Sequence, residues 1–176
     1  MSWVLEIVTI LWIVSSTFSV AKGATTATLW QGDKKGAVSI TFQDGLPSQF
    51  NNAFPILQRH GLKSTFFIIS ANADQNAIHA VTADGQEIGS QTVTGQSLTL
   101  PDSNQVYELS QSQLYLQQLT GQKVTTFAYP YGAYNPNVIN LVKNYYIAAR
   151  SAGLDQLNSS SPTPNEFYTL FTVVPY

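Results

Sequence analysis

The sequence predicts an α/β protein with a parallel sheet, because strand-like apolar runs alternate with segments of helical spacing. The clearest example starts with residues 37–42, a short β-branched and aromatic run. Residues 43–45 break this run and end in a glycine, which can adopt the positive φ of a tight turn. Residues 47–60 then carry apolar side chains at helical spacing, and residues 63–69 form a second apolar run. Together these segments predict a βαβ unit with an acidic residue at the C-terminal end of its first strand, where such folds collect chemistry.

The same alternation continues along the rest of the chain. Further helices are expected at residues 72–84, at a segment that Asp102 or Ser103 caps and that ends before Gly121, and at residues 136–144. Further strands are expected at residues 86–89, 123–128, 145–149 and 168–174. The chain of 176 residues is long enough for one domain with a substantial core.

The composition excludes several classes of function. Charged residues make up only 10% of the chain and the formal net charge is −2, so no basic surface is available for nucleic acid. The chain has no cysteine, which rules out disulfides and thiolate metal sites, and it has two histidines.

The first 23 residues are predicted to be an export segment. An apolar stretch covers residues 7–14, and small residues at 19 and 21 suit a signal peptidase. We therefore expect a secreted or cell-envelope protein. An uncleaved membrane anchor at residues 4–20 or a structured N-terminal helix are the alternatives, and residues 24–36 form a polar lead-in.

Three blocks of the sequence carry a resemblance to a known family. Residues 41–45 are Thr-Phe-Gln-Asp-Gly, residues 87–98 begin Glu-Ile-Gly-Ser-Gln-Thr, and residues 127–135 contain Pro-Tyr-Gly. In this order they resemble the motifs of the polysaccharide deacetylases, the carbohydrate esterases (family 4) with a NodB-homology domain. That family has Thr-Phe-Asp-Asp-Gly in the first block and His-Thr-x-x-His in the second.

The resemblance implies a fold and an activity. The fold would be a distorted, incomplete (β/α) barrel spanning residues 37–176, with the family's last motif missing. The family hydrolyses N- or O-acetyl groups of glycans with a divalent metal, usually zinc. The implied partner is a glycan of the chitooligosaccharide, peptidoglycan or acetylated xylan type.

This chain has other residues at most of the family's catalytic positions. Gln43 stands at the position of the family's base, and a carboxamide cannot take a proton at neutral pH. Asp44, Gln91 and Gly95 stand at the three metal-ligand positions, so both metal histidines are replaced. Carboxamide oxygen is a poor zinc ligand and glycine offers no side chain. We therefore expect no bound metal and no other cofactor.

The third block keeps more of the family pattern. Tyr131 matches the residue whose backbone N–H holds the oxyanion in the family, and Tyr129, Pro130, Tyr131 and Tyr134 would line the substrate groove. Aromatic faces of this kind suit stacking on sugar rings. Ala128 or Tyr129 occupies the region where the family often has an arginine that orients the base.

Three interpretations remain open at this point. The first is a non-catalytic relative that binds glycan in the groove where the family binds its substrate. The second is an active deacetylase with an atypical metal site or one shared between chains. The third is a structural or assembly module that self-associates through an open C-terminal barrel edge.

Overall fold

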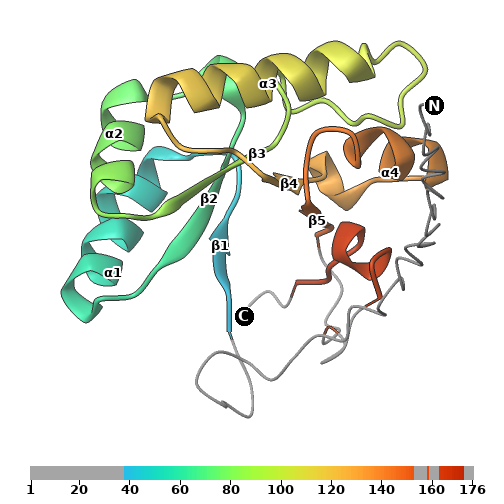
Figure 1. The fold of residues 1–176 in the computed structure, drawn as a ribbon. Coiled ribbons are helices and arrows are strands. Elements are labelled where there is room, and N and C mark those ends of the chain that lie inside the picture. The colour runs from blue at the N-terminus through green and yellow to red at the C-terminus, as the bar shows by residue number, and fades with distance from the viewer. Residues whose placement is uncertain (1–37, 153–157, 159–162, 173–176) are drawn as a thin grey trace, which may run out of the picture.

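The computed structural model describes residues 38–152, 158 and 163–172. Within them lies a five-stranded parallel sheet whose strands follow one another in sequence order. The strands are β1 (Ile40–Phe42), β2 (Ser64–Ile68), β3 (Glu87–Ser90), β4 (Thr126–Ala128) and β5 (Ala148–Arg150). The sheet curls from β1 to β5 (Figure 1). This arrangement confirms the expected fold class, an incomplete (β/α) barrel.

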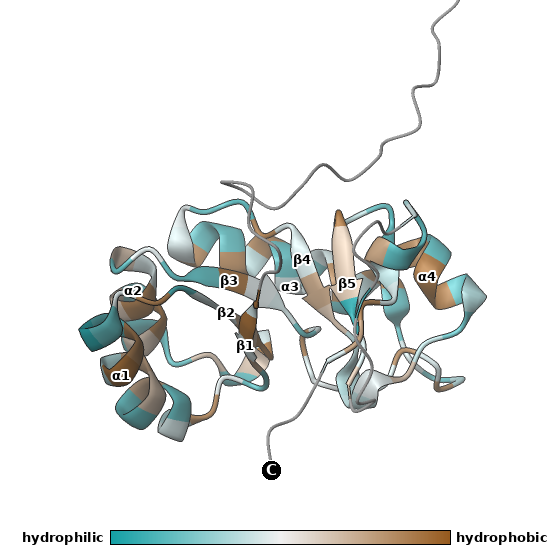
Figure 2. Cartoon of the chain, turned by 90° about the horizontal axis from the view of Figure 1, so that it is seen from below, coloured by the Kyte–Doolittle hydropathy of each residue, from teal (hydrophilic) through white to brown (hydrophobic). Residues whose placement is uncertain are grey.

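Helices connect the strands on the outer side of the curled sheet (Figure 1). The described α-helices are α1 (Phe54–His60), α2 (Gln75–Ala83), α3 (Gln105–Thr120) and α4 (Pro136–Val142). A π-helical turn at Gln49–Ala53 leads into α1, and short 3₁₀ turns lie at Ser70–Asn72, Pro130–Gly132 and Glu166–Tyr168. The helices carry hydrophobic and hydrophilic residues side by side (Figure 2), as expected of helices with one buried face.

The hydrophobic core fills the space between the sheet and the helices. Phe66 of β2 is fully buried, and its ring stacks on Phe42 at 4.9 Å and on Phe50 at 5.5 Å between ring centres. Further fully buried core residues are Ile78, Val81, Ile88, Leu109, Leu116, Val124, Phe127 and Val138. Burying each large side chain contributes about 1.5–3 kcal/mol, so this layer fixes the position of the strands.

On the concave face of the sheet, polar side chains of neighbouring strands are joined by hydrogen bonds. The hydroxyls of Thr65 and Thr126 donate to the Glu87 carboxylate at 2.5 and 2.8 Å, which joins β2, β3 and β4 on this face. Gly89 lies one layer higher, and a Cβ there would come within 2.5 Å of the Phe67 ring. Because the strands are parallel, their C-terminal ends all open onto the edge above this layer.

Two helices begin later than the sequence analysis predicts. Asp74 caps α2 by accepting from the Ala77 N–H at 3.1 Å, and Asn104 caps α3 by accepting from Tyr107 at 3.3 Å. The expected cap Ser103 instead donates its hydroxyl to loop carbonyls. The prediction of Asp102 or Ser103 as the cap was therefore wrong.

The expected last strand at residues 168–174 is also wrong in its described part. The helical turn Glu166–Tyr168 occupies its start, and its own hydrogen bonds use N–H groups that a strand would need. Leu170 forms an isolated parallel bridge with Arg150 at the outer edge of β5. Residues 173–174 lie outside the described residues, and self-association through this edge stays a prediction.

The predicted export segment, residues 1–23, and the lead-in at 24–36 lie outside the described residues. Among the described helices, none is both long and apolar enough to span a bilayer. The predicted domain boundaries stay predictions.

Gly132 gives a test of the loop after β4. It has a φ of +68°, and an added Cβ would lie 2.6 Å from the Ala152 backbone nitrogen. We expect Gly132→Ala to lower the free energy of unfolding by more than about 2 kcal/mol in urea denaturation, through left-handed strain and the backbone clash. Gly61→Ala is the matched control, because Gly61 has a φ of +62° with nothing within 4 Å, and it should cost only about 1 kcal/mol. Equal losses in the two variants would contradict the close approach at Gly132.

Candidate functional site at the barrel mouth

Three non-glycine residues with left-handed backbone mark the C-terminal edge of the sheet. Asp44, Thr92 and Tyr131 have φ values of 72°, 69° and 59°, and they follow β1, β3 and β4. They are the positive-φ non-glycine residues of the described chain. Each such conformation costs about 1–3 kcal/mol and persists only where the surroundings impose it, most often at functional sites. The candidate site therefore lies where these three loops meet the sheet, the edge that we call the barrel mouth.

The structure brings Asp44 and Gln91 together in a reciprocal hydrogen-bonded pair. The Gln91 Nε2 donates to Asp44 Oδ1 at 2.7 Å, and the Asp44 backbone N–H donates to Gln91 Oε1 at 3.0 Å. Gln91 is 4% exposed. One carboxamide thus satisfies the carboxylate and the main-chain donor of a strained residue, and its oxygen is already used as an acceptor.

Gly95 lies on the same loop as Gln91, and a side chain at this position would meet the Ile69 side chain. Its φ is +77°, its N–H donates to the Thr92 hydroxyl at 2.9 Å, and an added Cβ would lie 2.7 Å from Ile69 Cδ1. A histidine at this position would require the Ile69 side chain to move.

Glu108 holds this loop in place, and the sequence analysis missed it. The buried carboxylate accepts from the Val93 and Thr94 N–H groups at 2.8 and 2.9 Å and from the Thr94 hydroxyl at 2.9 Å. Glu108 is an acidic residue in the first turn of α3. An acidic residue at that place after a long loop was the available signal. The geometry of the second block thus depends on a charged residue outside it.

Gln43 follows β1 at the position of the family's base. Its Nε2 is buried and has no hydrogen-bond partner among the described residues. Alternation along β1 places it opposite Phe42, on the concave side of the sheet. A buried amide donor at this position can bind an acceptor but cannot remove a proton at neutral pH.

Arg150 brings a guanidinium to the mouth, which the sequence analysis also missed. Its register partner is Ala128, in the region where the family often has an arginine. Its guanidinium carbon lies 4.8 Å from the centre of the Phe67 ring on β2. The long side chain therefore crosses the concave face from β5 towards β1. A charged residue ending an apolar strand was the available signal.

The third block contributes less to a groove than expected. Tyr129 and Pro130 are buried, and the Tyr129 hydroxyl donates to the Tyr168 carbonyl at 3.0 Å. Burial raises the pKa of Tyr129. Tyr134 is half-buried, with its ring 5.1 Å from that of Tyr129. The placement of Tyr129 and Pro130 on a groove wall is thus corrected, and Tyr131, at 83% exposure, is the freely accessible ring of the four.

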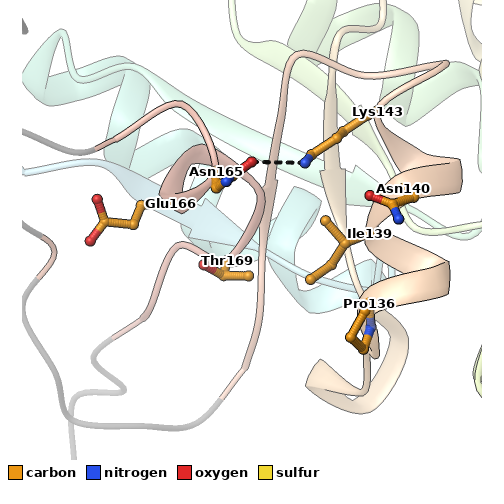
Figure 3. Close-up of a pocket in the computed structure, with 7 residues that line it drawn as sticks. All are labelled: Pro136, Ile139, Asn140, Lys143, Asn165, Glu166 and Thr169. Carbon is orange, nitrogen blue, oxygen red and sulfur yellow. Dashed lines mark hydrogen bonds between the residues drawn. The ribbon is translucent and has the colours of Figure 1, made fainter.

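A separate hollow of about 260 Å³ lies beside α4 and does not include the predicted site residues (Figure 3). Its lining residues are Pro136, Ile139, Asn140, Lys143, Asn165, Glu166 and Thr169. The Lys143 Nζ donates to Asn165 Oδ1 at 2.9 Å across it. This hollow lies between α4 and the segment of residues 165–169, and it is separate from the mouth.

The mouth does not fit the zinc ion that the resemblance implies. Its three ligand positions hold one carboxylate, one carboxamide whose oxygen is already engaged, and one glycine. Zinc in proteins takes imidazole, thiolate or carboxylate ligands. Over the part of the chain that is described, no group of three or more His, Cys, Asp or Glu side chains could hold a metal ion. His60 and His79 are both exposed on the helices.

A half-barrel of parallel strands with a polar site at their C-terminal ends defines the class as a (β/α) barrel protein with its site at the mouth. The polysaccharide deacetylase family matches residues 31–149, and the chain belongs to this family.

Curated relatives support the same assignment. A gellan lyase from Bacillus sp is 36% identical over 125 residues, which cover 69% of this chain and 5% of that protein. The peptidoglycan-N-acetylglucosamine deacetylase PgdA of Listeria monocytogenes is 30% identical over 57% of this chain and 22% of its own length. A chitooligosaccharide deacetylase from Azorhizobium caulinodans is 29% identical, covering 73% and 63%. The chain thus spans less than two thirds of each of these relatives.

Solved structures share the fold. A polysaccharide deacetylase from Bacillus cereus superposes with a TM-score of 0.73 at 25% identity, covering 80% of this chain and 48% of that one. A family pseudoenzyme from Bacillus anthracis has a TM-score of 0.57 at 21% identity, covering 63% and 41%.

The Glu108 contacts predict a local loss of protection. Glu108→Ala leaves the partly buried Val93 and Thr94 N–H groups without this acceptor, which should cost about 1–3 kcal/mol. We expect amide hydrogen exchange at Val93 and Thr94 to speed up by at least about 10-fold, because each 1.4 kcal/mol is a factor of ten. Glu108→Gln keeps an acceptor oxygen and should lose less. Glu166→Ala is the exposed control. Unchanged exchange in Glu108→Ala would show that the loop does not depend on this carboxylate.

Proposed function

We propose that this chain is a polysaccharide deacetylase-family domain that binds glycan at the barrel mouth without hydrolysing it. The observation that carries this proposal is the reciprocal pairing of Asp44 with Gln91. The one metal-ligand position of the family that keeps a carboxylate is tied to an amide, at the position where the family has a histidine. The structural part of the family site is kept while its chemistry is replaced.

The activation of water that acetyl-group hydrolysis requires is not provided by these side chains. Water must be activated, by a metal or by a base, and the leaving group must receive a proton. Gln43 offers no base, and the three ligand positions offer one carboxylate. An active enzyme with an atypical or shared metal would first have to break both Asp44–Gln91 hydrogen bonds.

Glycan binding is supported by the groups that the mouth presents. Tyr131 is 83% exposed and offers a ring on which a sugar can stack, while Gln43 and Asp44 are half-buried polar residues at the end of β1. The relatives are named for action on peptidoglycan N-acetylglucosamine and on chitooligosaccharide, which suggests an acetylated glycan as ligand. Export to the cell surface, where such polymers occur, is part of the proposal.

The purified protein tests the absence of catalysis. We expect no zinc above background by metal analysis after incubation with excess zinc and desalting. We also expect no acetate release from chitooligosaccharides or acetylated xylan, while a chitooligosaccharide shifts the fluorescence of the tyrosines at the mouth. Zinc-dependent acetate release that Asp44→Ala abolishes would refute the proposal in favour of the active enzyme.

Restoring the site tests whether the mouth is family-like. We expect the triple variant Gln43→Asp, Gln91→His and Gly95→His to bind zinc at least about 100-fold more tightly than the wild type. Exchanging even a residue that only supports a metal ligand changes metal affinity by about 10–100-fold, and this variant adds two ligands. Adding Ile69→Ala should strengthen binding further, since Ile69 Cδ1 stands 2.7 Å from the site of a Cβ at Gly95.

The triple variant without Ile69→Ala is the matched control. Isothermal titration with zinc measures the difference, and circular dichroism checks the fold. No zinc gained by either variant would mean that Asp44, Gln91 and Gly95 do not converge on one point.

A further inference from the structure

The guanidinium of Arg150 is buried with too few acceptors. Arg150 is 7% exposed, and Nη1 donates to the Ser151 carbonyl at 3.1 Å. Its Nε is buried without a partner among the described residues. Of the five N–H donors of this guanidinium, the one on Nε is thus buried and unpaired among the described residues. Burial lowers the pKa of Arg150 to about 10, which still leaves it charged at neutral pH.

The guanidinium stands at the mouth because its neighbours are small. Gly89 and Ala128 lie between β5 and Phe67 on the concave face, and neither has a side chain that could block the path. Asp44 is close enough to favour the charged form of Arg150. However, the two are not within the 4 Å of an ion pair, since Lys63–Asp84 is the ion pair found among the described residues.

A second donor without an acceptor lies at the same place. Phe42 pairs with Phe66, so Gln43 comes level with Phe67, the ring on which the guanidinium packs. The Gln43 Nε2 is buried and has no partner among the described residues. The register therefore brings the Gln43 side chain and the Arg150 guanidinium to the same ring on the concave side of the sheet, and each has a buried donor without a partner among the described residues. Gln49 Oε1, in the turn after β1, is a buried acceptor that also has no partner among these residues. Unpaired buried donors are costly, so such a site favours a ligand that supplies acceptor oxygens.

We propose that the mouth recognises an acidic sugar, with the carboxylate of a uronic acid residue bound by Arg150 and Gln43. This inference rests on the proposed glycan binding and adds the ligand class. A carboxylate accepts two parallel N–H bonds from a guanidinium and still has lone pairs for the amide of Gln43. The carboxylates of Asp44 and Glu87 repel such a ligand. Asp44 already accepts a hydrogen bond from Gln91, and Glu87 accepts from two threonine hydroxyls. A ligand carboxylate in direct contact with the Arg150 guanidinium gains more than it loses to these carboxylates, because the energy falls with distance.

The test compares one glycan in two charge states. The probe is an oligogalacturonate of defined length, and its partner is the same oligosaccharide with every carboxyl group reduced to an alcohol. We expect the full chain to bind the acidic form at least 10-fold more tightly by isothermal titration, with the difference shrinking at high salt. Arg150→Gln should remove the preference. Lys123→Gln, at an exposed lysine on the loop before β4, should keep it.

Gln43→Asp keeps the test decisive if Arg150→Gln does not fold. The new carboxylate would form an ion pair with the Arg150 guanidinium inside the protein. The preference for the acidic form should therefore fall below about threefold. An equal affinity of the wild type for both forms would overturn this inference and leave glycan binding standing. Binding of neither form, nor of chitooligosaccharide, would overturn both proposals. A preference that survives Gln43→Asp and Arg150→Gln would place the acidic sugar elsewhere and overturn the assignment.

Discussion

The hydrogen bonds between Asp44 and Gln91 join the loop after β1 to the loop after β3, and the geometry of the mouth depends on them. Asp44 has a left-handed backbone and a carboxylate, so it brings both a main-chain donor and a negative charge that need a partner. The Gln91 amide serves both at once. A metal ion could serve only the carboxylate. The Gln91 amide neither loses nor gains a proton at neutral pH. The contact therefore needs neither a metal ion nor a change of protonation at position 91.

The remaining parts of the mouth are held by contacts to residues outside the three sequence blocks, namely Glu108 and Ala152. The Glu108 carboxylate on α3 fixes the loop that contains Thr92, and Gly132 allows the loop after β4 to approach the Ala152 backbone. Left-handed strain at Thr92 and Tyr131 is kept only because such contacts impose it.

The sequence was sufficient to predict the order of strands and helices from β1 to β5, because apolar periodicity reports directly on burial. It was not sufficient after β5, where a helical turn stands at the start of the expected last strand. It was not sufficient for side chains whose partners are distant along the chain. The Tyr129 hydroxyl bonds to a carbonyl 39 residues away, which turns a supposed groove residue into a core residue. Arg150 reaches the mouth only because Gly89 and Ala128 are small. These three residues lie on three different strands, so their relation is visible only in the folded sheet. Motif positions carry no information of this kind.

The glutamine at the position of the family's base also changes what the mouth can bind. A carboxylate at position 43, as in the family motif, would give the Arg150 guanidinium an internal acceptor. With Gln43 in that place the negative charge is gone and a donor replaces it, so the mouth becomes more positive by one charge and has two unpaired donors. A neutral sugar offers hydroxyls that are weak acceptors for a buried guanidinium, whereas a carboxylate restores both the charge and the oxygens. The absence of a base and the preference for an acidic ligand then follow from the same residue. Gln43→Asp therefore changes both properties while the rest of the fold stays the same.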